Sequence, residues 1–233
     1  MISSLFFPLT SLAGPLDNVI DISSPQCNDY SSIGHRSFGI VGVNNAQGDF
    51  DANPCLSQEI QQFSTYALYI DLNYPSSHCP NPATREGAVA CGKNLGKWEV
   101  YQAASQHAQS NFWWFDVEGG PGTGISWSTN SLDQSFLAAL ALSVVHYEDI
   151  VFTNSDGVLL FGTQVGYYST KDDWPSITGN GNGWDHNAPA WLSVGDQPSS
   201  SELNSDCKYN LTGGPDYYVQ WYVGSPIDVD ISC

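Results

Sequence analysis

The chain has 233 residues, of which 41% are hydrophobic and 13% aromatic, enough for one large domain with its own core. Its 24 Asp and Glu residues outnumber 6 Lys and Arg, which gives a formal net charge of -18 at pH 7. We expect this charge to repel nucleic acid and anionic membrane surfaces. The sequence also lacks an uninterrupted apolar run of about 18 residues that could span a membrane.

Six cysteines, an even number, predict three disulfides and a secreted, extracellular protein. Their spacing includes no Cys-x-x-Cys pair and no zinc-finger cluster, and the histidines show no ligand spacing, so we expect no metal. Nearness in the sequence favours a bond between Cys79 and Cys91. It leaves open the pairing of the other four cysteines, which are Cys27, Cys55, Cys207 and Cys233.

Residues 1–17 have an apolar stretch and small residues but lack the positively charged start of an export signal. They are either a truncated export signal or an ordinary N-terminal segment. Residues 18–233 show no internal repeat and are expected to form a single domain.

Strand and helix patterns alternate through the first half of the chain. Buried β-branched or aromatic runs predict strands over 19–24, 38–43 and 66–72. Asn53 and Pro54 predict the start of a helix of about ten residues, and an apolar stripe predicts another helix over 97–109. The segment that holds Cys79 and Cys91 is expected to be a long loop over the mouth of a barrel.

The run Phe112-Trp113-Trp114-Phe115-Asp116-Val117-Glu118 predicts a strand that is buried on both faces and ends in two acids. Because side chains alternate along a strand, Asp116 and Glu118 should point to the same side. The glycine-rich segment 119–124 would leave both acids at the carboxyl end of the strand, where α/β barrels place their chemistry. No Lys follows these glycines, so they do not predict a phosphate site, and we expect no cofactor.

The second half contains fewer helices. One helix is predicted from Ser131, as its N-cap, to about His146. The segment 150–161 could be a hairpin or an extra strand, and 174–185 is expected to be irregular. Strands are predicted over 164–169, 190–194, 217–223 and 227–231. We therefore expect an α/β fold, a modified (β/α) TIM-like barrel with an incomplete outer ring of helices.

Four short motifs occur in one order along nearly the whole chain. They are Asp21-Ile22-Ser23 with Gln26, Asp116-Val117-Glu118, Tyr167-Tyr168-Ser169-Thr170 with Trp174, and Gln220-Trp221 with Val229-Asp230-Ile231. In this order and spacing they resemble the motifs of family 25 glycoside hydrolases, the muramidase-type lysozymes. The resemblance implies a modified (β/α) barrel and cleavage of a β-1,4 glycosidic bond.

The resemblance also implies roles for four acids, with Glu118 as the proton donor. Glycoside hydrolysis needs one protonated acid and one carboxylate, and crowding keeps one acid protonated near neutral pH. We therefore predict Glu118 as acid and base, with Asp116 as its orienting or stabilising partner. Asp21 and Asp230 would flank them to bind substrate or position the nucleophile. Asp228 lies on the same strand face as Asp230 and could be the one that points inward.

Four further residues are candidate substrate contacts: Asp71, Asn44, Tyr168 and Trp221. The two aromatic rings could stack on sugars. Asn44-Asn45 stands where the family carries Thr-Glu-Gly, and Asp71-Leu72-Asn73 stands where muramidases carry Tyr-His. We therefore expect the specificity to differ from that of muramidases.

The sequence thus favours a secreted, monomeric glycoside hydrolase that acts on a peptidoglycan-like or other polysaccharide. The net charge favours a neutral glycan over an anionic polymer. The alternative is a non-catalytic carbohydrate-binding or surface protein built on the same barrel.

Overall fold

The computed structural model describes residues 19–27, 29–45, 50–74, 77–119, 126–156, 162–179, 188–195, 197–221 and 228–233. The prediction for residues 1–17 lies outside these ranges, as do the glycines of 120–124 and parts of 150–161, 174–185, 217–223 and 227–231.

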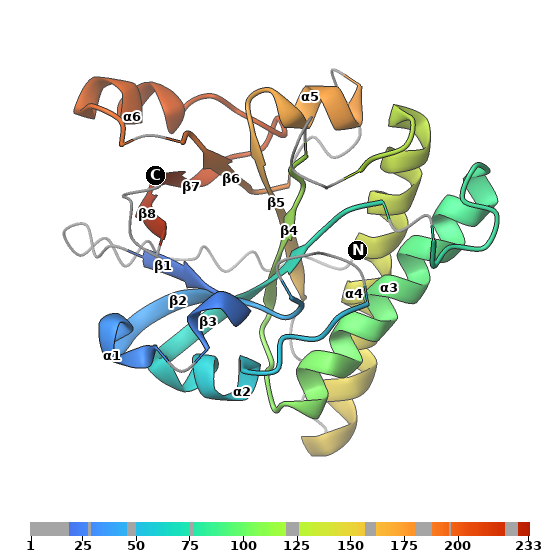
Figure 1. The fold of residues 1–233 in the computed structure, drawn as a ribbon, viewed down its shortest axis with the longest axis horizontal. Coiled ribbons are helices and arrows are strands. Elements are labelled where there is room, and N and C mark those ends of the chain that lie inside the picture. The colour runs from blue at the N-terminus through green and yellow to red at the C-terminus, as the bar shows by residue number, and fades with distance from the viewer. Residues whose placement is uncertain are drawn as a thin grey trace, which may run out of the picture.

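Within the described residues, eight strands form one closed barrel in chain order (Figure 1). They are β1 (Val19–Ile22), β2 (Arg36–Gly42), β3 (Phe63–Asp71), β4 (Phe112–Asp116), β5 (Gln164–Thr170), β6 (Ala190–Ser193), β7 (Asp216–Trp221) and β8 (Asp228–Ser232). Strands β1 to β7 run parallel to their neighbours, whereas β8 is antiparallel to both β7 and β1. The predicted TIM-like barrel is confirmed, with its last strand reversed.

Alternate side chains of the strands fill the barrel interior. One buried cluster there consists of Val19, Ile40, Ala67, Trp114, Tyr168 and Trp191. Their neighbours along the strands, such as Ile20 and Trp113, belong to a second cluster that includes helix residues. A Cβ atom on Gly166 would lie 2.4 Å from the Trp114 ring, so this position needs glycine. The interior is therefore a packed aromatic core, and any chemistry has to occur at its ends.

Two long helices, α3 (Arg85–Ser105) and α4 (Asn130–Asp156), lie side by side against the outside of the barrel (Figure 1). The other helices in the described ranges are short: α1 (Tyr30–Ile33), α2 (Leu56–Glu59), α5 (Asp173–Thr178) and α6 (Ser200–Asp206), with 3₁₀ turns η1 (Ser24–Gln26) and η2 (Ile60–Gln62). This distribution confirms the predicted incomplete outer ring.

Helix α4 is long and apolar enough over Asn130–Phe152 to cross a membrane, with a mean hydropathy of 1.5. Its residues Phe136, Leu140 and Val144 are fully buried and belong to the main core. This burial is that of a core helix that covers a barrel, which accounts for its apolar composition.

Several predicted elements are wrong in extent. Helix α3 begins at Arg85 rather than at residue 97, so Cys91 lies within a helix and not in a long loop over the mouth. The helix after Pro54 is a short α2 followed by η2, and Phe63 already starts β3. Residues 150–156 continue α4 and form neither a hairpin nor a strand.

Helix positions differ elsewhere too. Helix α4 begins at Asn130, so Ser131 is not its N-cap. The segment expected to be irregular contains most of α5, and the sequence did not predict α1 or α6.

Three disulfides link the six cysteines, which confirms their predicted number and the Cys79–Cys91 bond. The other two bonds join Cys27 to Cys55 and Cys207 to Cys233.

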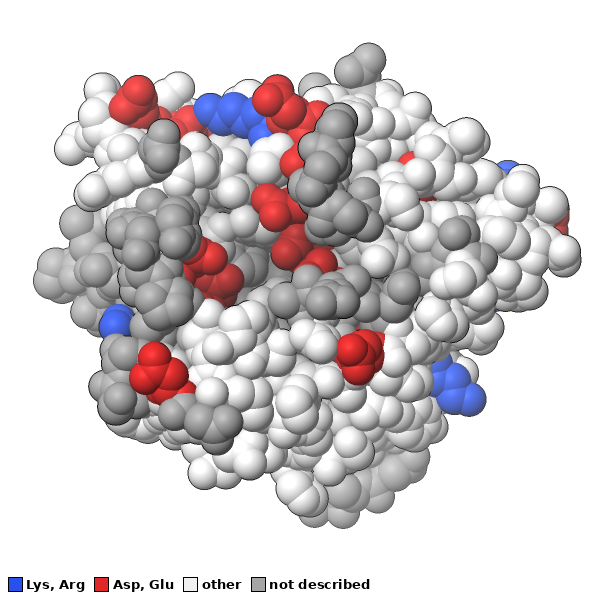
Figure 2. All heavy atoms as spheres, in the orientation of Figure 1, with Lys and Arg blue, Asp and Glu red and all other residues white. Residues whose placement is uncertain are grey.

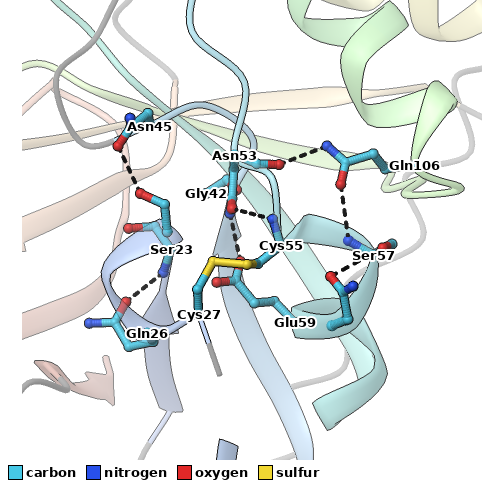
Figure 3. The surroundings of a disulfide bond; sticks show 12 residues. Ser23, Gln26, Cys27, Gly42, Asn45, Asn53, Cys55, Ser57, Glu59 and Gln106 are labelled. Atoms are coloured by element: carbon cyan, nitrogen blue, oxygen red, sulfur yellow. Dashed lines mark hydrogen bonds between the residues drawn. A yellow bond between two sulfur atoms is a disulfide. The ribbon is translucent and has the colours of Figure 1, made fainter. Parts of the chain in front are cut away.

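The Cys27–Cys55 bond lies beside a buried polar group (Figure 3). The Asn53 amide donates to Gly42 O at 2.8 Å and to Glu59 Oε2 at 2.6 Å, and its oxygen accepts from the Cys55 N–H at 2.9 Å. These contacts fasten the segment after β2 to the start of α2.

Candidate functional site

Six half-buried acids gather where the strands end at one mouth of the barrel. We call this group the acid cup: Asp21 of β1, Asp71 of β3, Asp116 of β4, Glu118 after β4, Asp173 of α5 and Asp228 of β8. Strand register explains part of the grouping, because Asp71 pairs with Asp116 across β3 and β4, and Asp21 pairs with Asp228 across β1 and β8. Figure 2 shows acidic side chains gathered in the middle of this face of the molecule.

Burial is the main cause of unusual acidity in the cup. It raises the pKa of Glu118 to about 7, with further increases from the charges of Asp173 and Asp228. Burial, then Asp228, raises the pKa of Asp21 to about 7. Burial, then Glu118, does the same for Asp71. Several of these acids therefore change protonation near neutral pH.

Asp116 is surrounded by other acids of the cup. Burial raises its pKa well above the ordinary value, and the charges of Glu118, Asp71 and Asp21 raise it further. Its Oδ1 atom is buried and has no hydrogen-bond partner among the described residues. Burial and these charges therefore favour the protonated form of Asp116.

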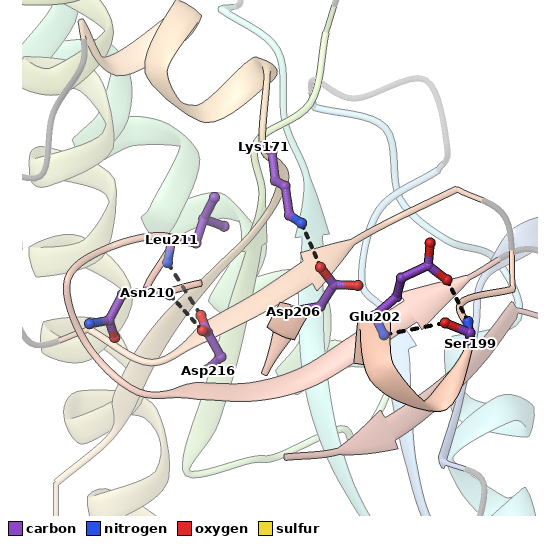
Figure 4. A network of polar contacts seen from close by, with 7 residues as sticks. All are labelled: Lys171, Ser199, Glu202, Asp206, Asn210, Leu211 and Asp216. Atoms are coloured by element: carbon purple, nitrogen blue, oxygen red, sulfur yellow. Dashed lines mark hydrogen bonds and ion pairs between the residues drawn. The ribbon is translucent and has the colours of Figure 1, made fainter. Parts of the chain in front are cut away.

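No basic side chain in the described part of the chain pairs with the cup. Lys171 follows β5 directly, but its Nζ contacts Asp206 Oδ1 at 2.5 Å (Figure 4). The Nζ atom also lies 4.9 Å from the Tyr209 ring centroid. Protonation can compensate the mutual repulsion of the cup acids.

A chain of hydrogen bonds crosses the barrel beside the cup. The Tyr168 hydroxyl donates to Gln220 Oε1, and Gln220 Nε2 donates to Asp21 Oδ1 at 3.1 Å. The Tyr168 side chain also contacts the Glu118 carboxyl, and this contact lowers the pKa of Glu118. The hydrogen-bond chain connects β5, β7 and β1.

Asp230 lies deeper in the barrel than the cup. It is 0% exposed, and its Oδ1 accepts a hydrogen bond from Trp191 Nε1 at 2.7 Å. Burial and the nearby Asp21 raise its pKa well above the ordinary value. Asp228, by contrast, is half-buried and acts on both Asp21 and Glu118. Of the two, Asp230 is enclosed in the barrel, and Asp228 is the partly exposed one near the other cup acids.

Three predicted substrate contacts are almost fully buried. Asn44 is 1% exposed, and its amide binds both the backbone O and N–H of Asp71, at 2.7 and 2.9 Å. Tyr168 and Trp221 are 7% and 6% exposed, so little of either ring is available for stacking on a sugar. In this structure Asn44 orders the end of β3, whereas Asp71 lies in the cup.

The sequence analysis missed two residues at the site. Asp173 belongs to a local pattern in which Thr170 Oγ1 donates to Asp173 Oδ2 and accepts from the Asp173 N–H, both at 2.9 Å. A Thr followed three residues later by an acid could have revealed this turn. Glu99 of α3 is fully buried, and its carboxyl oxygens have no hydrogen-bond partner in the part of the chain that the structure describes. Burial and the charge of Asp71 raise its pKa well above the ordinary value. An acid on the apolar face of a predicted helix is the sequence pattern that could have indicated Glu99.

A metal centre is not supported by the cup geometry. Among the residues that the structure describes, no group of three or more His, Cys, Asp or Glu could hold a metal ion. The arrangement offers instead proton donors and carboxylates of similar pKa at one opening.

The barrel, its reversed eighth strand and its two long helices give this chain the fold of family 25 glycoside hydrolases. It is similar to the muramidase from Acremonium alcalophilum, with a TM-score of 0.56, 15% identity and 93% of both chains covered. It is also similar to a family GH25 lysozyme from Aspergillus fumigatus, with a TM-score of 0.54, 14% identity and 93% of both chains covered.

A third similar structure is the bacterial lysozyme from Streptomyces coelicolor, with a TM-score of 0.51, 15% identity, and coverage of 92% of this chain and 89% of that one. No protein-family model and no curated protein matches the sequence. The predicted resemblance is thus confirmed for the fold.

Proposed function

We propose that the chain is a secreted glycoside hydrolase in which Glu118 is the acid and base. The supporting observation is the acid cup, where burial and mutual repulsion hold carboxyl groups near a pKa of 7. An acid that stays protonated near neutral pH can protonate the glycosidic oxygen, while a neighbouring carboxylate stabilises the developing positive charge. The fold shared with muramidases is consistent with this chemistry.

The proposed roles follow the depth of each acid. Glu118 protonates the leaving oxygen. Asp116 is the partner that orients or stabilises Glu118. Asp21 holds the substrate or positions the nucleophile from β1. Asp230, fully buried below Asp21, acts on the reaction through its charge and through Asp21 rather than by touching a sugar. Asp228 takes the outward position on β8.

We propose a polysaccharide substrate, peptidoglycan-like or other, with little negative charge at the bond that is cut. Unpaired acids in the cup would repel an anionic chain, whereas a neutral glycan meets no such barrier. Asp71 is well placed to contact this substrate from β3. Contacts from Asn44, Tyr168 and Trp221 stay predictions, which their burial does not favour. The three disulfides fit an oxidising, extracellular compartment, and we propose that the protein acts as a monomer.

The test is release of reducing sugars from a panel of glycans by the wild type and by Glu118→Gln. The panel contains peptidoglycan, chitin, partly deacetylated chitin and a neutral β-glucan. The wild type should cleave at least one of them, and Glu118→Gln should lower the rate about 10²- to 10⁴-fold, because it removes general acid catalysis.

Glu202→Gln is the matched control, since Glu202 is exposed on α6, away from the strand ends. It should keep the wild-type rate. Equal rates for the wild type and Glu118→Gln would reject the catalytic role. Binding without cleavage would favour the non-catalytic alternative.

A further inference from the structure

The main chain of Glu118 is held by side chains, because this residue lies beyond the end of its strand. Strand β4 ends at Asp116, two residues earlier. The peptide group before Glu118 is held by Ser169 Oγ, which donates to Val117 O at 2.5 Å. The peptide group after it is held by Trp127 Nε1, which donates to Glu118 O at 2.8 Å. The two bonds bracket the Cα atom that carries the proposed acid.

The Trp127 ring is in turn supported by the core. It is half-buried and meets the Phe136 ring edge to face, at a centroid distance of 6.4 Å. Phe136 belongs to α4 and is fully buried, and the Tyr74 ring packs on it as well, at 5.5 Å. An edge-to-face contact with a buried ring limits how far the indole can turn. Its N–H group therefore keeps its direction toward Glu118.

The residues on both sides of Trp127 are fastened too. Ser126 O accepts from the Tyr74 N–H at 2.9 Å, and the Ser128 N–H donates to Asp133 Oδ1 at 2.9 Å. Asp133 is 1% exposed in the first turn of α4. Three consecutive residues are thus bonded to three different parts of the barrel: the segment after β3, the end of β4 and the start of α4.

We propose that Trp127 is a positioning residue that holds Glu118 in the orientation needed for proton transfer to the glycosidic oxygen. This inference deepens the proposed function and rests on it. A general acid has to lie within hydrogen-bond reach of the oxygen, and a displacement of about 1 Å can lower a rate about 10²-fold. Because Trp127 bonds to the main chain of Glu118, it fixes the position of the carboxyl group without competing for its proton.

The kinetic test is Trp127→Phe, which keeps an aromatic ring beside Phe136 but removes the N–H group. On the glycan that the wild type cleaves, kcat should fall about 5- to 50-fold, while KM changes less than about twofold. Trp98→Phe is the matched control, since Trp98 is half-buried on α3 and packs on Phe50 at 5.6 Å. It should keep both constants. A raised KM with unchanged kcat in Trp127→Phe would make the ring a sugar contact and overturn the inference.

A second readout needs no activity: the pH titration of the Glu118 carboxyl by carbon-13 NMR, with the signal assigned by Glu118→Gln. Burial is the main reason why this pKa is about 7, and the charges of Asp173 and Asp228 raise it further, whereas the Tyr168 hydroxyl lowers it. A Glu118 released from Trp127 should spend more time in solvent and lose part of the largest of these effects. Its pKa should therefore fall toward 4.5, by about one pH unit.

The shift should be confined to Glu118 in Trp127→Phe. The Asp21 signal, assigned with Asp21→Asn, should titrate as in the wild type, and Trp98→Phe should move neither signal. An unmoved Glu118 titration in Trp127→Phe overturns the inference, as does an equal shift in Trp98→Phe. A wild type that cleaves no glycan rejects the proposed function, whereas an active wild type in which Trp127→Phe leaves kcat and the titration unchanged rejects the role of Trp127 alone.

Discussion

At the scale of single residues, Trp191 and Asp230 form a contact on which the buried end of the site depends. Trp191 Nε1 donates to Asp230 Oδ1 at 2.7 Å, and within the described ranges Asp230 Oδ2 has no hydrogen-bond partner. Trp191 is thus a side-chain donor to a fully buried acid.

Trp191→Phe should lower the free energy of unfolding by about 1–3 kcal/mol, because it leaves a buried acid without its donor. The measurement is urea unfolding at pH 7. Trp98→Phe removes an indole from a half-buried position on α3 and should cost less. Equal losses in the two variants would show that the ring, and not its hydrogen bond, matters at Trp191.

Alternation along a strand predicted that Asp116 and Glu118 lie on one side, but no local rule indicated how the acids of the site are connected. Alternation along one strand places Asp116 and Glu118 on the same side, and both join the cup. The bond from Gln220 to Asp21 spans 199 positions in the sequence. The residues near Gln220 in the sequence do not indicate its partner. The same is true of Asn44, a buried residue whose amide is hydrogen-bonded to the backbone of Asp71. Such contacts depend on barrel closure, which local patterns do not describe.

At the scale of elements, the strands were predicted well because β-branched and aromatic runs are rarely anything else. Helix α3 was predicted too short for a physical reason. Its first half contains Gly87, Gly92 and Gly96, and glycine has a low helix propensity. These glycines instead serve packing: a Cβ atom on Gly92 would lie 2.2 Å from the Phe136 O atom of α4. The tertiary contact overrides the local preference.

Gly92→Ala should therefore destabilise the protein although alanine favours helices. Its methyl group would meet the α4 backbone, which cannot move aside as a side chain could, and we expect a loss of about 1–3 kcal/mol or more. Thermal unfolding followed by circular dichroism would measure it. Asn94→Ala, on the exposed face of the same helix, should be neutral or slightly stabilising. A stability gain in both variants would contradict close packing of α3 and α4.

At the scale of the whole molecule, buried acids should make stability fall as pH rises. Burial raises the pKa of Glu59 to about 7 and that of Glu148 to about 8, from ordinary values of 4.5. It also raises the pKa values of Asp21, Asp71 and Glu118 to about 7. Between about pH 4 and pH 8 the folded chain keeps protons that the unfolded chain has lost. Folding is therefore favoured at the acidic end of this window, and the advantage disappears as these groups ionise. The net charge of -18 acts in the same direction.

Urea unfolding at pH 5, 6, 7 and 8 should give steadily decreasing free energies. Glu148→Gln keeps an acceptor for Trp113 Nε1, which donates to Glu148 at 2.6 Å, but cannot ionise, so its decrease above pH 6 should be smaller. Glu202→Gln, at an exposed position, should follow the wild type. Stability that is constant or rises from pH 5 to pH 8 would contradict this prediction.

The reversed strand β8 also determines when the barrel can close during synthesis. It seals the gap between β7 and β1, and it brings both Asp228 and Asp230. The ribosome has to synthesise β8 up to Ser232 before this strand can join β7 to β1. A shorter nascent chain therefore has an open, incomplete barrel. Under the proposed function, such a chain could not digest glycans of the cell that makes it, and hydrolytic power would appear only after β8 has joined the barrel.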